Sequence, residues 1–262
     1  MTLPPPALAD ASVWIVDLDG VLWLAGEPIG DVSGAVATLR RHGARVVYAT
    51  NNSSPTTAEM LARLAAVGID AGPGDLITSA QVAASLLEPG ERVHLLGEGG
   101  TREALVARGV LVVEDGAVDA TVVGWSRSFT FATLAAAATA ARHAGRLIGT
   151  NSDPTHPTPD GLVPGSGALL AAVATASGVT PQVAGKPNGP MVAYVRRHLL
   201  AGGERAVMVG DQPATDGLLA ERLGIPFALV DSGVTPPGAP VDDCPVAVRS
   251  ADLVTLVAAA LG

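Results

Sequence analysis

Short runs of apolar residues alternate with longer amphipathic segments along the whole chain. The apolar runs predict buried strands at residues 13–17, 45–50, 76–78, 93–96, 110–113, 121–123, 146–150, 182–184, 206–210, 226–230 and 246–248. The longer segments, such as 56–67, 80–87, 130–144, 167–177, 190–200 and 216–223, predict helices. Strands that alternate with helices predict an α/β fold whose mostly parallel sheet is covered on both faces.

Composition narrows the class of protein. The 262 residues suggest two domains, and 48% hydrophobic residues supply a core. A net charge of −9 argues against nucleic acid, and no apolar run approaches the length of a membrane helix. The single Cys244 excludes an internal disulfide or a zinc–thiolate site. Residues 1–10 hold three prolines and no positive charge, unlike a secretory signal. We therefore expect a cytoplasmic protein.

Two aspartates follow the first apolar run. Val13–Val16 lead into Asp17 and Asp19, and Gly20 allows the backbone to turn sharply. Side chains alternate along a strand, so both carboxylates can point to the same side. Two such charges about 4 Å apart repel by about 4 kcal/mol at an effective dielectric constant of about 20. The pair predicts a cation, a proton or a lysine between the carboxylates; a solvated turn is the alternative.

The chain contains one lysine, Lys186, among 16 basic residues. It lies after the strand predicted at 182–184, and ligands of open α/β sheets bind at the carboxyl ends of strands. A compact ammonium group serves where a planar guanidinium does not fit, so the single lysine suggests a specific role. Chance is the alternative, because one lysine has to fall somewhere. Pro187 stands where a nucleotide-binding P-loop requires Ser or Thr.

Polar clusters lie at the carboxyl ends of two further predicted strands. Thr50, Asn51 and Asn52 follow one strand, where a hydroxyl and backbone amides can bind an anion at the start of a helix. An ordinary helix cap explains this cluster equally well. Asp211 and Asp216 follow the strand at 206–210. Asp216 could cap the following helix, an explanation that does not extend to Asp211.

Together, the motifs Asp17-x-Asp19, Thr50, Lys186 and Gly210-Asp211 with Asp216 resemble the haloacid dehalogenase (HAD) superfamily of phosphatases. The resemblance runs across nearly the whole chain. The stretches 17–23, 50–53 and 210–216 are most similar to the subfamily that contains NagD and the phosphatases of pyridoxal phosphate, phosphoglycolate and para-nitrophenyl phosphate. One departure is the stretch 212–214, where relatives often carry a charged residue.

The resemblance implies a magnesium-dependent phosphatase. Asp17 would attack phosphorus and form an aspartyl-phosphate. Asp19 would give a proton to the leaving alkoxide and later take one from water. Magnesium would bind the Asp17 carboxylate, the Asp19 backbone carbonyl and Asp211, while Asp216 orients this metal site.

The phosphate would be held by other residues of the same motifs. Thr50 and the Asn51 amide, with Asn52 beside them, would bind the phosphate oxygens. Lys186 would neutralise both the phosphate and Asp17. Positioning and charge stabilisation carry most of phosphoryl transfer.

The resemblance also implies a Rossmann-like, doubly wound parallel sheet as the core, with a smaller α/β cap domain inserted. We place the core at residues 1–88 and 182–262 and the cap at 89–181. The cap stretches 122–125 and 149–161 also resemble this subfamily. Relatives often dimerise through the cap, which suggests a homodimer.

Three cap residues are candidates for substrate specificity: Trp125, Arg127 and His156. A solvated surface charge is the simpler explanation of Arg127. A loop histidine that caps a turn beside prolines explains His156 as well as a functional role does.

Other activities stay open at this point. Haloacid dehalogenation needs no acid two residues after the nucleophile, so Asp19 argues against it. A phosphomutase could use the same core, and a non-enzymatic sensor of a phosphorylated ligand would need no nucleophile. The substrate would be a small phosphorylated metabolite, and glycerol phosphate, phosphoglycolate, sugar phosphates and pyridoxal phosphate all fit.

Overall fold

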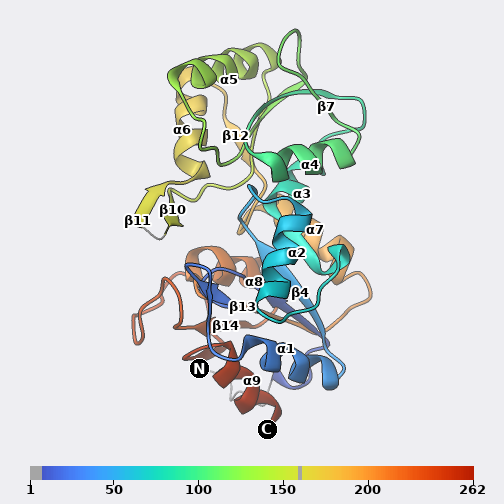
Figure 1. Cartoon of the computed structure of the whole chain (residues 1–262), viewed down its shortest axis with the longest axis vertical. Helices are drawn as coiled ribbons and strands as arrows, with labels where there is room; N and C mark the ends of the chain where they lie inside the picture. The colour runs from blue at the N-terminus through green and yellow to red at the C-terminus, as the bar shows by residue number, and fades with distance from the viewer. Residues whose placement is uncertain (1–7, 159–160) are drawn as a thin grey trace. The chain divides into compact units, whose positions relative to one another are not determined.

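The computed structural model describes residues 8–158 and 161–262. The chain divides into two compact units, each treated by itself (Figure 1). Unit 1 comprises Met1–Thr50, Leu61–Ile77 and Met191–Gly262, and unit 2 comprises Asn51–Met60 and Thr78–Pro190. The predicted domain boundaries after residues 88 and 181 stay a prediction. Residues 1–7, within the stretch that we compared with a secretory signal, and Asp160 of the cap stretch lie outside the described residues.

Unit 1 is built on a sheet with the strand order β15-β14-β13-β1-β4-β5. Strand β1 runs parallel to both β13 and β4, and β14 runs parallel to β13 and β15. All residues of β1 and β14 are buried, as expected for parallel strands covered on both faces. The strands are β1 (Val13–Val16), β4 (Arg45–Thr50), β5 (Leu76–Thr78), β13 (Ala206–Gly210), β14 (Phe227–Val230) and β15 (Val248–Ser250).

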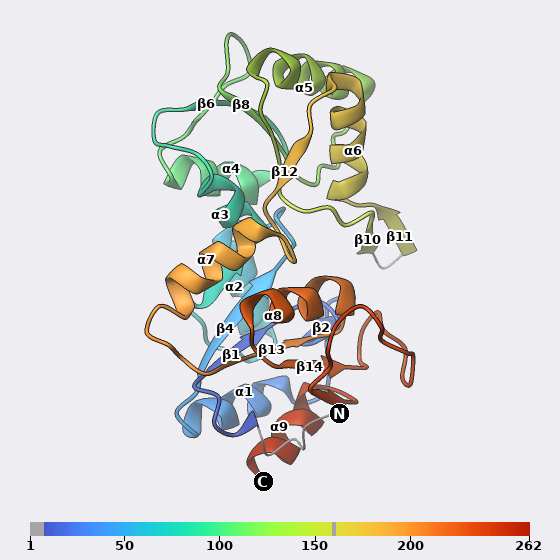
Figure 2. The same cartoon turned by 180° about the vertical axis from the view of Figure 1, so that it is seen from behind.

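Helices cover both faces of this sheet. Helices α1 (Val32–Arg41) and α9 (Leu253–Leu261) pack side by side on one face, and α8 (Leu218–Leu223) lies on the other, as Figures 1 and 2 both show. Most of α2 (Thr57–Ala66) and α7 (Gly189–Leu199) also belongs to unit 1. The short elements are the hairpin β2 (Trp23–Leu24) and β3 (Glu27–Pro28), a 3-10 turn at Pro73–Asp75 and a π-helical turn at Pro213–Gly217.

Unit 2 has its own sheet, with the order β12-β9-β8-β6-β7 and parallel neighbours throughout. Its strands are β6 (Arg92–Leu96), β7 (Leu111–Val112), β8 (Ala120–Val123), β9 (Leu147–Gly149) and β12 (Pro181–Val183). Its helices are α3 (Ser79–Ala84), α4 (Gly99–Ala107), α5 (Phe131–Ala144) and α6 (Ser166–Ser177). A buried cluster of Val123, Ala141, Leu170 and neighbouring apolar side chains joins α5 and α6 to the sheet.

The predicted α/β fold with parallel sheets is confirmed, and the predicted strands agree with the structure to within about two residues. The exceptions are two antiparallel hairpins, β2–β3 and β10–β11 (Thr155–Thr158 and Gly161–Pro164). Strands β2 and β3 are two residues long each, and β2 forms the end of the short apolar run at residues 21–24. Strands β10 and β11 are rich in Thr, Pro and Gly, so the pattern that predicts buried strands misses both hairpins. None of the helices in the described part of the chain is long and apolar enough to cross a membrane.

Candidate active site

Strand register brings the first and last predicted acidic motifs together. Val16 of β1 pairs with Val209 of β13, and the Asp17 backbone N–H donates to the Val209 carbonyl at 2.9 Å. Asp17 and Asp211 therefore follow the carboxyl ends of two neighbouring parallel strands. In open α/β sheets this edge is where ligands bind.

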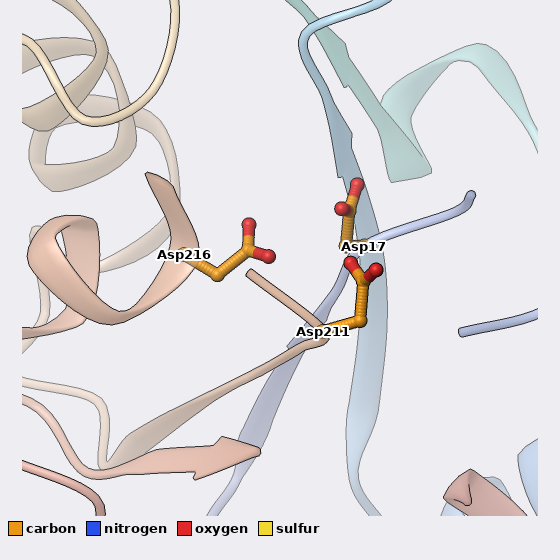
Figure 3. A group of neighbouring side chains, drawn as sticks. All are labelled: Asp17, Asp211 and Asp216. Atoms are coloured by element: carbon orange, nitrogen blue, oxygen red, sulfur yellow. The ribbon is translucent and has the colours of Figure 1, made fainter. Parts of the chain in front are cut away.

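A third carboxylate completes the cluster. One carboxylate oxygen each of Asp17, Asp211 and Asp216 lies within 4.8 Å of the other two, and Asp216 reaches the pair from the turn after β13 (Figure 3). All three residues are buried, Asp17 at 6% exposure and the others at 0%. Three oxygen donors of this kind suit a hard divalent cation. Asp216 thus offers a carboxylate oxygen to the same cluster, and its predicted role of orienting the metal site stays a prediction.

Glycines make room for these acids. A Cβ atom at Gly20 would lie 2.4 Å from Asp211 Oδ2, and Gly20 also has a φ of +78°. A Cβ at Gly233 would lie 2.0 Å from the same oxygen, and one at Gly210 would lie 2.2 Å from Asp216 Oδ2. Real Cβ atoms do not approach carboxylate oxygens so closely, so any side chain at these positions has to displace an acid.

The segment 231–239, which directly follows β14, holds Asp211 in place. The Val234 N–H donates to Asp211 Oδ2 at 2.6 Å, and the Thr235 hydroxyl donates to the Asp211 carbonyl at 2.5 Å. The Ser232 hydroxyl donates to the Gly20 carbonyl at 2.7 Å, so the same segment contacts the loop that follows Asp17. Sequence reasoning missed this segment, although its position after a buried parallel strand could have placed it at the same sheet edge.

Arg249 fixes both ends of this segment. Its Nε donates to Asp231 Oδ1 at 2.9 Å, and its terminal nitrogens donate to the carbonyls of Ala239 at 2.6 Å and Pro236 at 2.9 Å. A planar guanidinium can make these contacts in several directions at once. Arg249 therefore supports the backbone that donates to Asp211.

Asp19 lies in a different environment from Asp17. It is exposed, and its Oδ1 accepts a hydrogen bond of 2.9 Å from the indole Nε1 of the buried Trp23. The group of three acids in the described residues does not include its carboxylate. Thr50 ends β4, the other neighbour of β1, and is 2% exposed.

In unit 2, Asn51 and Lys186 lie side by side. Asn51 Oδ1 accepts from the Lys186 backbone N–H at 2.8 Å, and Asn51 Nδ2 donates to the Lys186 carbonyl at 3.1 Å. The Asn51 carbonyl accepts from Asn151 Nδ2 at 2.7 Å and from the Ser79 hydroxyl at 2.6 Å. Asn52 Oδ1 accepts from the Ser54 N–H at 3.2 Å. The predicted roles that would combine residues of the two units stay predictions.

The three cap candidates form one contiguous group in unit 2. The rings of Trp125 and His156 have centroids 4.8 Å apart, and the Arg127 guanidinium carbon lies 5.3 Å from the centre of the Trp125 ring. The Trp125 indole N–H donates to the Pro164 carbonyl at 3.0 Å, which fixes the ring. The group combines an aromatic surface with a cation, and its part in substrate recognition stays a prediction.

Cys244 packs against the turn that carries Asp216. A Cβ at Gly217 would lie 2.1 Å from its sulfur, and burial, with the nearby acids Glu221, Asp243 and Asp216, raises the pKa of Cys244 to about 11. The thiol is therefore protonated at neutral pH.

Comparison with known families identifies the class of protein. The family model of haloacid dehalogenase-like hydrolases matches residues 14–111, and a second model of HAD-like hydrolases matches residues 183–255. The acid sugar phosphatase of Staphylococcus haemolyticus is 33% identical over 226 residues, which cover 85% of this chain and 86% of the relative. The chain belongs to the haloacid dehalogenase-like hydrolase family.

Solved structures agree with this assignment. The glycerol phosphate phosphatase of Mycobacterium tuberculosis, in complex with calcium, superimposes with a TM-score of 0.85 at 32% identity, covering 97% of this chain and 76% of its own. The same enzyme in complex with magnesium gives a TM-score of 0.84 at 32% identity, covering 98% and 78% of the two chains. The 4-nitrophenylphosphatase of Thermotoga maritima gives a TM-score of 0.86 at 28% identity, and the match covers 97% of this chain and 98% of that enzyme's chain.

Proposed function

We propose that this protein is a magnesium-dependent phosphatase that hydrolyses small-molecule phosphate monoesters. The observation that carries the proposal is the trio of buried carboxylates at the carboxyl ends of β1 and β13. The names of its relatives, an acid sugar phosphatase and a glycerol phosphate phosphatase, support the same reaction class.

The donor set fits Mg²⁺. Asp17, Asp211 and Asp216 offer only oxygen atoms, the ligands that Mg²⁺ prefers, and the backbone carbonyl of Asp19 is the fourth candidate. When bound, Mg²⁺ supplies positive charge that offsets the carboxylates and the incoming phosphate. The glycerol phosphate phosphatase was crystallised with magnesium and with calcium, which supports a divalent cation in this family.

Asp17 and Asp19 carry out different parts of the proposed hydrolysis. A carboxylate oxygen of Asp17 forms a bond to phosphorus while the bond from phosphorus to the ester oxygen breaks, and Asp19 gives its proton to the departing oxygen. Water then attacks the phosphorus of the aspartyl-phosphate, passes a proton to Asp19 and releases inorganic phosphate together with the free Asp17 carboxylate. The Trp23 indole holds the Asp19 carboxylate through both steps.

Other residues bind the transferred group. In this proposal the phosphate oxygens are bound by Thr50, Asn52 and the backbone amide of Asn51. Lys186 neutralises the phosphate and Asp17. The resemblance of their motifs to the family supports these roles. The bound phosphate needs such partners because a chain of net charge −9 does not attract anions by its overall field.

The substrate that we propose is a phosphorylated sugar or polyol, such as glycerol phosphate. The group of Trp125, Arg127 and His156 in the cap is our candidate for recognising its organic part. The aromatic faces suit the apolar C–H faces of a carbohydrate, and Arg127 suits hydroxyl oxygens or a second anionic group. We further expect a cytoplasmic protein and a homodimer formed through the cap.

The decisive assay measures release of inorganic phosphate from para-nitrophenyl phosphate, glycerol phosphate and a panel of sugar phosphates, with magnesium and with a chelator. We expect phosphate release that requires magnesium and transfer of phosphate to water. A phosphomutase would instead return the phosphoryl group to the sugar, which mass spectrometry of the products detects. Binding of phosphate esters without turnover would overturn the enzymatic proposal in favour of a sensor.

A further inference from the structure

The side chain of Asn51 contacts both backbone groups of Lys186. Asn51 Oδ1 accepts from the Lys186 N–H at 2.8 Å, and Asn51 Nδ2 donates to the Lys186 carbonyl at 3.1 Å. The N–H belongs to the peptide plane before the Lys186 Cα, and the carbonyl belongs to the plane after it. Because both planes are held by one amide group, φ and ψ of Lys186 are fixed and so is the direction in which its side chain leaves the backbone.

The orientation of the Asn51 amide is determined by its surroundings. Nδ2 also lies 3.2 Å from both carboxylate oxygens of Asp153. In the reversed orientation the Asn51 oxygen would face the Asp153 carboxylate and the Lys186 carbonyl, and Nδ2 would face the Lys186 N–H. Every contact would then join two donors or two acceptors. The orientation in the structure is the one that satisfies all partners.

The neighbouring residues make room for this contact and hold Asn51 itself. A Cβ at Gly185 would lie 2.5 Å from Asn51 Oδ1 and 2.7 Å from the Thr150 carbonyl, so the amide can reach Lys186 only beside a glycine. The Asn51 backbone carbonyl accepts from Ser79 and Asn151. Lys186 is 1% exposed. A long ammonium side chain is thus attached to a backbone that Asn51 holds on both sides of the Lys186 Cα.

We infer that Asn51 is a positioning residue for Lys186: its side-chain amide sets the backbone of Lys186 so that the ammonium group is delivered in one direction. This inference rests on the proposed role of Lys186 in phosphate transfer. It gives the Asn51 side chain a task separate from the Asn51 backbone amide, which we assign to the phosphate.

The test is a double-mutant cycle in the full-length protein with magnesium and para-nitrophenyl phosphate. We expect Asn51→Ala to lower kcat/KM at least tenfold. In a Lys186→Ala background, the same substitution should lower it less than twofold, because the group that Asn51 positions is already gone. Full activity of Asn51→Ala, or equal losses in both backgrounds, would overturn the inference.

A matched control separates positioning from general loosening of the loop. Asn188 Nδ2 donates to the Gly185 carbonyl at 3.0 Å, so through this bond Asn188 holds the peptide plane before Lys186, whereas Asn51 holds the planes on both sides of it. Asn188→Ala should lower kcat/KM less than threefold. A loss as large as that of Asn51→Ala would contradict the inference. If Asn51→Ala does not fold, Asn51→Asp keeps the volume and removes the Nδ2 donor, and the same tenfold loss is expected.

Hydrogen exchange tests the contact without reference to activity. The Lys186 amide proton should exchange at least tenfold faster in Asn51→Ala than in the wild type, and no faster in Asn188→Ala. Unchanged exchange would overturn the inference even if activity falls. If instead Lys186→Ala retains wild-type activity while the exchange result holds, the positioning contact stands and the proposed role of Lys186 fails.

Discussion

The two units contain polar clusters of opposite character. In unit 1, three carboxylates lie within 4.8 Å of one another, and each pair at this distance repels by about 3 kcal/mol at an effective dielectric constant of about 20. In unit 2, the Asn51 side chain matches its donor and acceptor to the Asp153 carboxylate and the Lys186 backbone, and the Asn151 side chain does the same with the backbones of Asn51 and Asp153. In the first cluster like charges repel one another and a bound cation would offset them, whereas in the second cluster donors and acceptors are matched.

This difference separates two ways in which a polar residue serves an enzyme. A buried group that its neighbours repel is kept for its chemistry, since it costs stability. A buried group whose donors and acceptors are all matched keeps other residues in place. The comparison makes opposite predictions about stability for substitutions in the two units.

The largest effect is expected for Asp17→Asn. Losing the nucleophile should lower kcat at least 1000-fold, on the order of 4 kcal/mol of transition-state stabilisation. The thermal midpoint of the metal-free protein should stay unchanged or rise, because one of three mutually repelling charges is removed. Steady-state kinetics and calorimetric melting measure both. Near-normal turnover would show that Asp17 is not the nucleophile.

Removal of the metal comes next. A chelator should lower activity at least 100-fold, and added magnesium should restore it. Magnesium should also raise the melting temperature, because a ligand at 100 times its dissociation constant stabilises by about 2.7 kcal/mol. The Asp211→Asn variant serves as the control and should lose most of this thermal shift. Full activity in metal-free buffer would contradict the proposed mechanism.

The matched network of unit 2 should respond to Asn151→Ala in the opposite way from the acids. Asn151 is 4% exposed, and its side chain donates to the Asn51 carbonyl and accepts from the Asp153 N–H. Removing it breaks these two hydrogen bonds, so the free energy of unfolding should fall by about 2 kcal/mol. Urea denaturation with and without magnesium measures this change. If Asn151→Ala were as stable as the wild type, the distinction between the two clusters would not hold.

Replacing Lys186 by Arg tests whether the single lysine is there by chance. A planar guanidinium cannot take the place of a compact ammonium group, so we expect at least a tenfold loss in kcat/KM, about 1.4 kcal/mol. The melting temperature should change little. Wild-type kinetics in Lys186→Arg would favour chance and remove Lys186 from the proposed site.

The smallest effect is expected for Trp23→Phe, which removes the hydrogen bond to Asp19. Turnover of an alkyl phosphate should fall about fivefold, on the order of 1 kcal/mol for one hydrogen bond, because its leaving group needs the proton from Asp19. Para-nitrophenyl phosphate has a good leaving group and should be affected less. Trp14→Phe in β1 is the matched control, since Trp14 is also a buried indole. Equal losses with both substrates would point to a structural role for Trp23.

Sequence reasoning located the acids but not what surrounds them. Asp17 and Asp211 could be predicted as neighbours because each ends an apolar run, and parallel strands bring their carboxyl ends to one edge. The contacts of Asn51 with Asp153 and Lys186 join residues about 100 and 135 positions apart, and no local pattern encodes them. The support of Asp211 by Val234 depends in the same way on tertiary packing, and the partner of Asp19 is Trp23 of the short hairpin β2–β3, which the predicted strands do not include.

The glycines beside the acids limit which substitutions this sequence can tolerate. Gly20, Gly210 and Gly233 contribute no reacting atom, yet the space of a single methyl group at each is already taken by a carboxylate. A library of random variants selected for activity should therefore lose substitutions at these three positions as completely as at the aspartates themselves. During evolution we therefore expect glycine to be retained at these three positions for as long as the aspartates are retained.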